Sequence, residues 1–191
     1  MTNFLPIHAS DLDGILSEIQ RQTAEVTALL EPLSLEVLNW RPSESRWSVG
    51  GHVDHLVVLN TPYLRTLGTA LRQARAEGRS SDGPYRHPWL SRRFAASMEP
   101  PPKRRWKTAR TMAPSAEVGA DVSERFAACQ AELSTLVQQA RGVDLGRTRI
   151  SSPFMKLLRF SVGGAFGILL EHNRRHIWLI REVMSSSGFP G

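Results

Sequence analysis

Four long stretches with helical apolar spacing constrain the fold of this chain most strongly. They cover residues 10–31, 48–77, 116 or 121–141 and 161–184. Each repeats apolar residues three or four positions apart, which is the pattern of a helix with one buried face. Helices of this kind bury their faces against one another, so the spacing predicts an all-α four-helix bundle. The length of 191 residues suits one domain with a full core, and we expect a single domain over residues 1–191.

Serine, glycine and proline residues mark the ends of these stretches. Ser10 and Ser48 are expected N-caps, since a serine side chain can accept a hydrogen bond from a free amide of the first turn. Gly78 and Gly142 are expected to end the second and third helices. Pro62 lies inside the second stretch and predicts a kink or a break, because proline removes one helical hydrogen bond.

Three connecting segments are not expected to contain long helices. Residues 34–38 are expected to form a short turn of helix, and residues 143–160 form a connector in which no strand pair is evident. The long segment 79–115 is broken by prolines and includes a possible short helix at 89–98. It either crosses over the bundle and covers a pocket, or it is a structured connection without a chemical role. His87, which lies in this segment, is given no role.

The charge of the chain permits polyanion binding without specifying it. The formal net charge is +6, and much of the excess lies in the basic segment 92–110. A nucleic-acid partner is not expected, because no helix-turn-helix, RNA-binding or zinc-finger signature accompanies this segment. A polyanion site there would bind with a steep salt dependence.

Cysteine content and hydropathy indicate the cellular compartment. The single cysteine, Cys129, rules out an intrachain disulfide framework and a cysteine-based zinc site, and its place on an apolar helix face favours a core residue over a nucleophile. No apolar run is long enough to span a bilayer, and residues 1–17 do not have the pattern of a signal peptide. We therefore expect a cytoplasmic protein without a membrane partner.

Two histidines stand one helical turn apart in the last stretch. His172 and His176 are four positions apart, so they share a helix face with apolar neighbours. The charged residues of this stretch fall on the other side: Glu171, Arg174, Arg175, Arg181 and Glu182. Two imidazoles in this arrangement can hold one metal ion. Alone, the pair is a weak signal, and the competing interpretation is two core histidines bonded to backbone or water.

The second stretch supplies candidates for a third ligand. His52 and His55 are one turn apart beside its apolar stripe. By helical angle His52 lies nearer the centre of the stripe, close to Leu59 and Tyr63, and periodicity does not select between the two histidines.

The combination of these motifs resembles the DinB-like family. Segments 38–42 and 47–56 are similar to the start of the second helix in that family, where a Trp-Ser pair is followed by a His-Leu pair eight residues after the tryptophan. Counting eight residues from Trp47 gives His55. His172 and His176 match the second mark of the family, an HxxxH motif in the last long helix. The departures from the family pattern are Pro62 and the long basic segment, which concern the cover of a pocket rather than the fold.

The resemblance implies an up-down-down-up four-helix bundle with a long crossover between the second and third helices. It also implies a divalent metal, most often zinc or nickel, on His55, His172 and His176, and in many members a homodimer. Family members include metal-dependent thiol transferases, which would make a low-molecular-weight thiol the expected small-molecule substrate.

Two classes of function are consistent with these residues. The first is a metal-dependent thiol S-transferase or hydrolase, since three neutral imidazoles leave a coordination position open for a nucleophile. Its catalytic residues are not identified by the sequence, although some polar residues could orient a nucleophile: Asp54, Asn60, Tyr63 and Asn173. The second is a non-catalytic bundle that binds a metal or small ligand, or takes part in a stress-response interaction.

Overall fold

A computed structural model of the chain describes residues 12–83, 93, 96–101, 108–155 and 157–191. The expected cap at Ser10, His87 and most of the possible helix at 89–98 lie outside these residues. So do most of the basic residues of the segment 92–110. No helix among the described residues is both long enough and apolar enough to cross a membrane.

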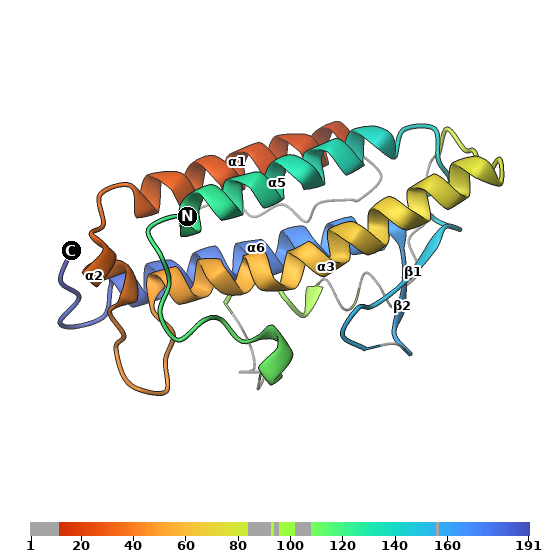
Figure 1. Ribbon diagram of the computed structural model, residues 1–191. Helices are drawn as coiled ribbons and strands as arrows, with labels where there is room; N and C mark the ends of the chain where they lie inside the picture. Colours follow the sequence, from red (N-terminus) through yellow and green to blue (C-terminus); the bar gives the residue numbers. More distant parts are fainter. Residues whose placement is uncertain (1–11, 84–92, 94–95, 102–107, 156) are drawn as a thin grey trace.

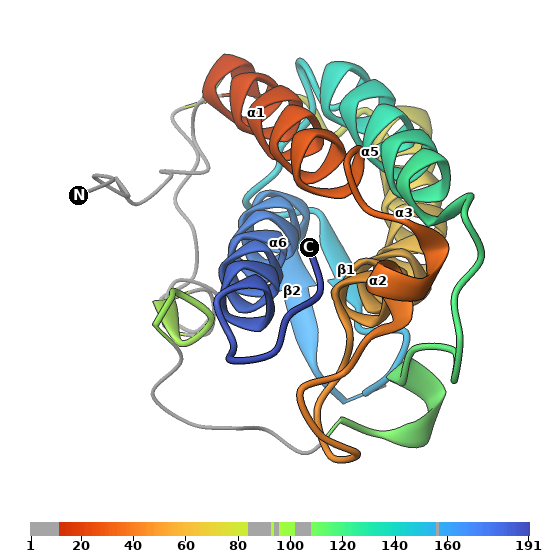
Figure 2. The same cartoon turned by 90° about the vertical axis from the view of Figure 1, so that its left-hand side faces the viewer.

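Four long helices pack side by side as a bundle, as the apolar spacing predicted (Figures 1 and 2). They are α1 (Leu12–Leu30), α3 (Val49–Ala76), α5 (Val122–Gln139) and α6 (Val162–Met184). Helices α1 and α6 run in one direction and α3 and α5 in the other, so the order along the chain is up-down-down-up. Each helix packs against two neighbours, in the cyclic order α1, α5, α3, α6. Two further short elements are α2 (Leu35–Asn39) and the 3₁₀ turn η1 (Arg110–Met112).

The helix ends follow local chemistry that the sequence displays. The hydroxyl of Ser48 accepts a hydrogen bond from the amide of Gly51 at 3.0 Å, and Ser161 caps α6 in the same way. Gly78 and Gly142 follow α3 and α5 with φ angles of 67° and 75°, which glycine adopts without strain. Of the two outcomes expected at Pro62, a kink or a break, the break does not occur, since α3 continues through Pro62 from Val49 to Ala76.

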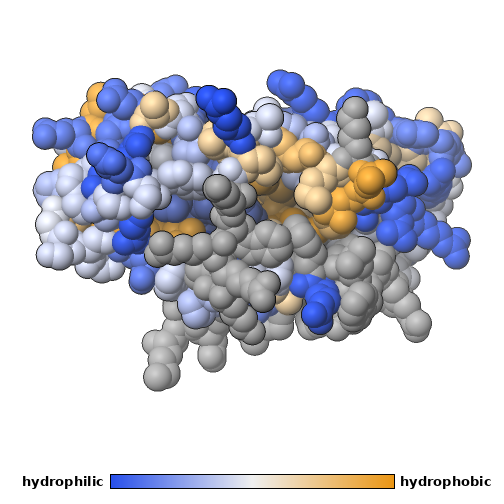
Figure 3. Space-filling model, turned by 90° about the horizontal axis from the view of Figure 1, so that it is seen from below, coloured by the Kyte–Doolittle hydropathy of each residue, from blue (hydrophilic) through white to orange (hydrophobic). Residues whose placement is uncertain are grey.

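A small β-hairpin corrects the expectation that residues 143–160 contain no strand pair. Strand β1 (Arg149–Ser151) pairs antiparallel with β2 (Arg159–Ser161), with Ile150 opposite Phe160. The hairpin packs on α3, where the hydroxyl of Tyr63 lies 2.9 Å from that of Ser152. The loop between its strands leaves Met155 and Leu157 exposed, and apolar surface gathers toward this end of the molecule (Figure 3).

A layer of amide side chains divides the apolar core into two parts. Each long helix contributes one fully buried member: Gln22, Asn60, Gln130 and Asn173. Asn60 donates to Asn173, which in turn donates to Gln22 and Gln130 at 3.0 and 3.3 Å. On α1, α3 and α6 the amide falls between the buried residues of one apolar cluster and those of the other, and on α5 Gln130 directly follows Cys129, where the change of cluster occurs. Because these amides bond across the bundle, they favour one axial alignment of the four helices.

Cys129 lies in the first of these clusters, as its position on the helix face predicted. Burial raises the pKa of its thiol to about 11, so the sulfur is protonated near neutral pH. A buried, protonated thiol is a poor nucleophile, which is consistent with a structural role.

Candidate metal centre

Helices α3 and α6 bring His55, His172 and His176 together at their interface. One ring nitrogen from each histidine can be chosen so that all three lie within 4.8 Å of one another, and all three side chains are buried. The Nε2 atoms of His55 and His172 are 3.4 Å apart. The structure therefore brings together the three residues that the family resemblance implied as metal ligands.

The spacing and chemistry of this triad fit a divalent metal ion. Two nitrogens on one tetrahedral zinc, each at about 2.0–2.1 Å, are about 3.3–3.4 Å apart. His55 Nδ1 lies 2.5 Å from the carbonyl oxygen of Met112, which can only accept, so Nδ1 carries the proton and Nε2 presents its lone pair to His172. Among the described residues, His172 Nδ1 is buried without a hydrogen-bond partner. The triad thus contains one lone pair aimed at a neighbouring imidazole and one buried nitrogen without a bond, so it is not a fully satisfied hydrogen-bond network.

The structure separates the roles of His52 and His55, which periodicity left open. His55 joins the triad, whereas His52 lies behind it and contacts His176 through the two Nδ1 atoms at 3.0 Å. His52 is also buried. His52, which lies nearer the centre of the apolar stripe, is therefore not a member of the triad but contacts one of its members, His176.

Trp47 covers one side of the histidines, a role that the sequence interpretation missed. Its ring centroid lies 4.8 Å from that of His55 and 6.0 Å from that of His176, with the latter pair stacked at 20°. The ring of Trp40 contacts that of Phe189 edge-on, with the centroids 5.6 Å apart. The tryptophan next to the Ser48 cap thus shields the candidate site from solvent.

Burial keeps the imidazoles neutral. It lowers the pKa of His52 to about 3, with smaller contributions from His55 and Arg46. Burial also lowers the pKa of His172 and His176 well below the usual range. For His55 burial lowers the pKa as well, although the hydrogen bond to Met112 opposes the effect. Neutral imidazole is the form that binds zinc and nickel.

Four polar residues were considered as groups that could orient a nucleophile. The hydrogen bonds of their side chains join them to groups other than the triad nitrogens. Asp54 accepts from the amide of Ser115 at 2.8 Å and from Arg125 at 2.7 Å, so it anchors the chain just after Met112. Tyr63 bonds to the hairpin, and Asn60 and Asn173 belong to the amide layer. Asp54 thus acts indirectly, by holding the segment whose carbonyl orients His55.

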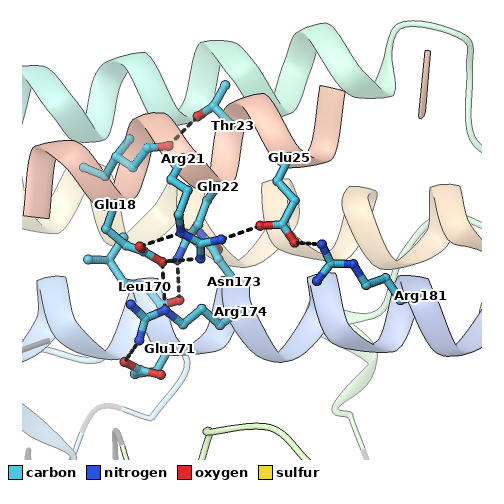
Figure 4. Close-up of polar contacts among 11 residues, drawn as sticks. Glu18, Arg21, Gln22, Thr23, Glu25, Leu170, Glu171, Asn173, Arg174 and Arg181 are labelled. Carbon is cyan, nitrogen blue, oxygen red and sulfur yellow. Dashed lines mark hydrogen bonds and ion pairs between the residues drawn. The ribbon is translucent and has the colours of Figure 1, made fainter. Parts of the chain in front are cut away.

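Around the triad, the side of α6 that faces away from the histidines is also buried. In a simple amphipathic helix that side would be exposed to solvent. Arg174 donates to Glu18 of α1 and to Glu171, both at 2.7 Å (Figure 4). Glu18 also accepts from Arg21 and Gln22. Burial raises the pKa of Glu18, but the bonds from Arg21 and Arg174 outweigh it and lower the pKa to about 2. Of the charges that helical angle placed opposite the histidines, Glu171 and Arg174 are therefore buried and form an ion pair, whereas Arg181 and Glu182 are exposed.

Comparison with known proteins settles the family. A sequence model of the DinB superfamily matches residues 18–180, which include all three histidines. The chain belongs to the DinB superfamily. No curated protein matches the chain at a significant level.

A solved structure shares the fold of this DinB-superfamily chain. It is YfiT from Bacillus subtilis, described as a probable metal-dependent hydrolase with an unusual four-helix bundle topology. The TM-score is 0.55 at 17% sequence identity, and the alignment covers 93% of this chain and 88% of that one. The resemblance confirms the four-helix topology expected from the sequence.

Proposed function

We propose that this protein binds one divalent metal ion, zinc or nickel, on His55, His172 and His176 and uses it to activate a small nucleophile. The observation that carries the proposal is the 3.4 Å separation of His55 Nε2 and His172 Nε2 in a buried site, with His176 one turn further along α6. The described hydrogen bond to Met112 directs the His55 lone pair into this site.

The chemistry proposed is hydrolysis or thiol S-transfer. An ion with three imidazole ligands has a position for water or a thiol and lowers the pKa of whichever group occupies it. The metal-dependent hydrolase description of YfiT supports the first reaction, and the resemblance to metal-dependent thiol transferases supports the second. The protein contributes fixed ligand geometry, neutral imidazoles and the ring of Trp47, which packs on His55 and His176.

A second candidate function is a non-catalytic metal-binding bundle. The observation that favours it is the cover over the triad, since His55 and His176 are only 3% and 5% exposed and Trp47 packs on both. A catalytic site must admit a substrate to the open coordination position, whereas a structural site is closed.

Elemental analysis of protein purified without a histidine tag tests the proposal. We expect about one zinc or nickel per chain, and loss of that metal in each of H55A, H172A and H176A. Unchanged metal content in any of these variants would refute the ligand assignment.

A functional screen then separates the two candidates. Zinc-loaded and nickel-loaded protein should hydrolyse activated esters or amides, or transfer a low-molecular-weight thiol to an electrophile, and H172A should lose that activity. Stoichiometric metal without either reaction, together with a W47A variant that also remains inactive, would support the non-catalytic bundle.

A further inference from the structure

The contact between His52 and His176 carries information about how the candidate site is built. The two Nδ1 atoms are 3.0 Å apart, within hydrogen-bond distance, and the two side chains are 7% and 5% exposed. At this distance one nitrogen carries the proton and the other accepts it. The direction of the bond decides which nitrogen of His176 remains available to a metal.

Only one direction leaves His176 able to coordinate through Nε2. If His52 donated, the neutral His176 ring would accept at Nδ1 and carry its proton on Nε2, which would block that atom as a ligand. If His176 donates from Nδ1, its Nε2 has a free lone pair. Metal-binding histidines commonly donate their second ring nitrogen to an acceptor in this way, which fixes both tautomer and orientation.

The same arrangement occurs at His55 with a different acceptor. There the carbonyl of Met112 accepts from Nδ1 at 2.5 Å and directs Nε2 toward His172. His52 lies on α3 three positions before His55, so a single helix supplies both a ligand and the acceptor that orients a ligand on α6. Trp47 contacts the His52 ring at a centroid distance of 5.3 Å and limits its rotation.

We propose that His52 is a positioning residue of the metal centre, whose Nδ1 accepts a hydrogen bond from His176 Nδ1–H and so selects Nε2 of His176 as the coordinating atom. This proposal rests on the proposed binding of a metal by the triad. It assigns a role to a histidine that is not one of the three ligands.

Zinc affinity of the full-length protein tests the role with two variants at one position. H52F keeps a planar ring but cannot accept, and we expect zinc affinity to fall by about 10–100-fold, the usual effect of losing such a partner. H52N is the matched control, because its Oδ1 can occupy a position close to that of His Nδ1 and accept the same bond. We expect H52N to recover most of the lost affinity. Thermal unfolding of the metal-free variants shows whether each remains folded.

Long-range ¹H–¹⁵N NMR of the imidazoles in zinc-loaded protein provides a readout that a merely structural role would not change. We expect the proton of His176 on Nδ1 in the native protein and in H52N, with faster solvent exchange of that proton in H52F. A proton on Nε2 of His176, or equal zinc affinity in H52F and the native protein, would overturn the positioning role.

X-ray absorption of the zinc-loaded protein distinguishes the remaining outcomes. Three imidazoles at the metal support the proposal, whereas four would make His52 a ligand and overturn it. If the native protein binds no zinc or nickel, the proposed function itself fails. Tight zinc binding that H172A abolishes and H52F leaves unchanged refutes the role of His52 alone.

Discussion

Residues 171–176 of α6 take part in two buried polar regions, and these differ in the groups that face one another. Toward α1, Arg174 lies between Glu18 and Glu171, and opposite charges meet at 2.7 Å. Toward α3, His172 faces another neutral imidazole, and two like groups meet at 3.4 Å. The first region is stabilised by its own charges. In the second region no opposite charges pair, and the two facing Nε2 atoms are held together by a proton on one of them or, as proposed above, by a metal ion.

The largest expected effect on the unfolding free energy comes from removing the ion pairs of Arg174 on the α1 side of α6. R174A leaves Glu18 and Glu171 buried without their shared cation, and removing one partner of a buried pair costs about 3–5 kcal/mol of unfolding free energy. Urea unfolding of the metal-free protein measures it. R181A is the matched control, because Arg181 pairs with Glu25 at the same 2.7 Å but is 49% exposed, and it should cost about 1 kcal/mol or less. Equal losses in both variants would show that burial is not the deciding factor.

The second largest effect is expected from acid, which should reduce the contribution of Glu18, on the α1 side of α6, to the unfolding free energy. The folded-state pKa of Glu18 is about 2, below its ordinary 4.5, so its contribution is present above pH 4.5 and is lost as pH falls toward 2. A shift of this size corresponds to about 3 kcal/mol. Unfolding free energies of the native protein and E18Q across this range measure it, and the E18Q curve should be flatter. Parallel curves for the two proteins would contradict the assignment.

Zinc should raise the unfolding free energy of the protein only by binding to the histidines between α3 and α6. At a free zinc concentration of about 100 times the dissociation constant, the unfolding free energy of the native protein should rise by about 2.7 kcal/mol. H172A should lose this gain, whereas R174A should keep it despite its lower starting stability. A gain of equal size in H172A would place zinc elsewhere on the chain.

The smallest expected effect concerns the support of His55. D54N keeps an acceptor for the Ser115 amide but loses the charge that attracts Arg125, which should cost about 1–2 kcal/mol of unfolding free energy. Because Asp54 holds the segment that contains Met112, zinc affinity should also fall, by less than 10-fold. Calorimetric titration with zinc measures the affinity, and an unchanged value would separate Asp54 from the site.

Features determined by nearby residues were predictable from the sequence. The apolar spacing gave the four long helices, and the serines that cap α3 and α6 lie where local hydrogen bonding places them. The choice of His55 over His52 came from the resemblance to a family, because both positions border the same stripe. The structure then assembled the triad, and metal binding by it stays a prediction.

Features that depend on distant partners were not predictable. Strands β1 and β2 have three residues each, too few for an alternating pattern to be recognised. The burial of Arg174 depends on Glu18, which is 156 positions away in sequence. The orientation of His55 depends on the carbonyl of Met112, a backbone atom that every residue type possesses. Such an acceptor leaves no signature in the sequence of side chains.

The bond between His55 and the carbonyl of Met112 links the crossover region to the candidate site thermodynamically. Met112 ends the 3₁₀ turn η1, which belongs to the connection between α3 and α5. If the state of η1 that supplies this carbonyl binds metal more tightly, metal binding must favour that state by the same factor. The same reciprocity applies to a molecule that binds η1 in another position. Such a molecule lowers the metal affinity by some factor, and the metal lowers the affinity for that molecule by the same factor.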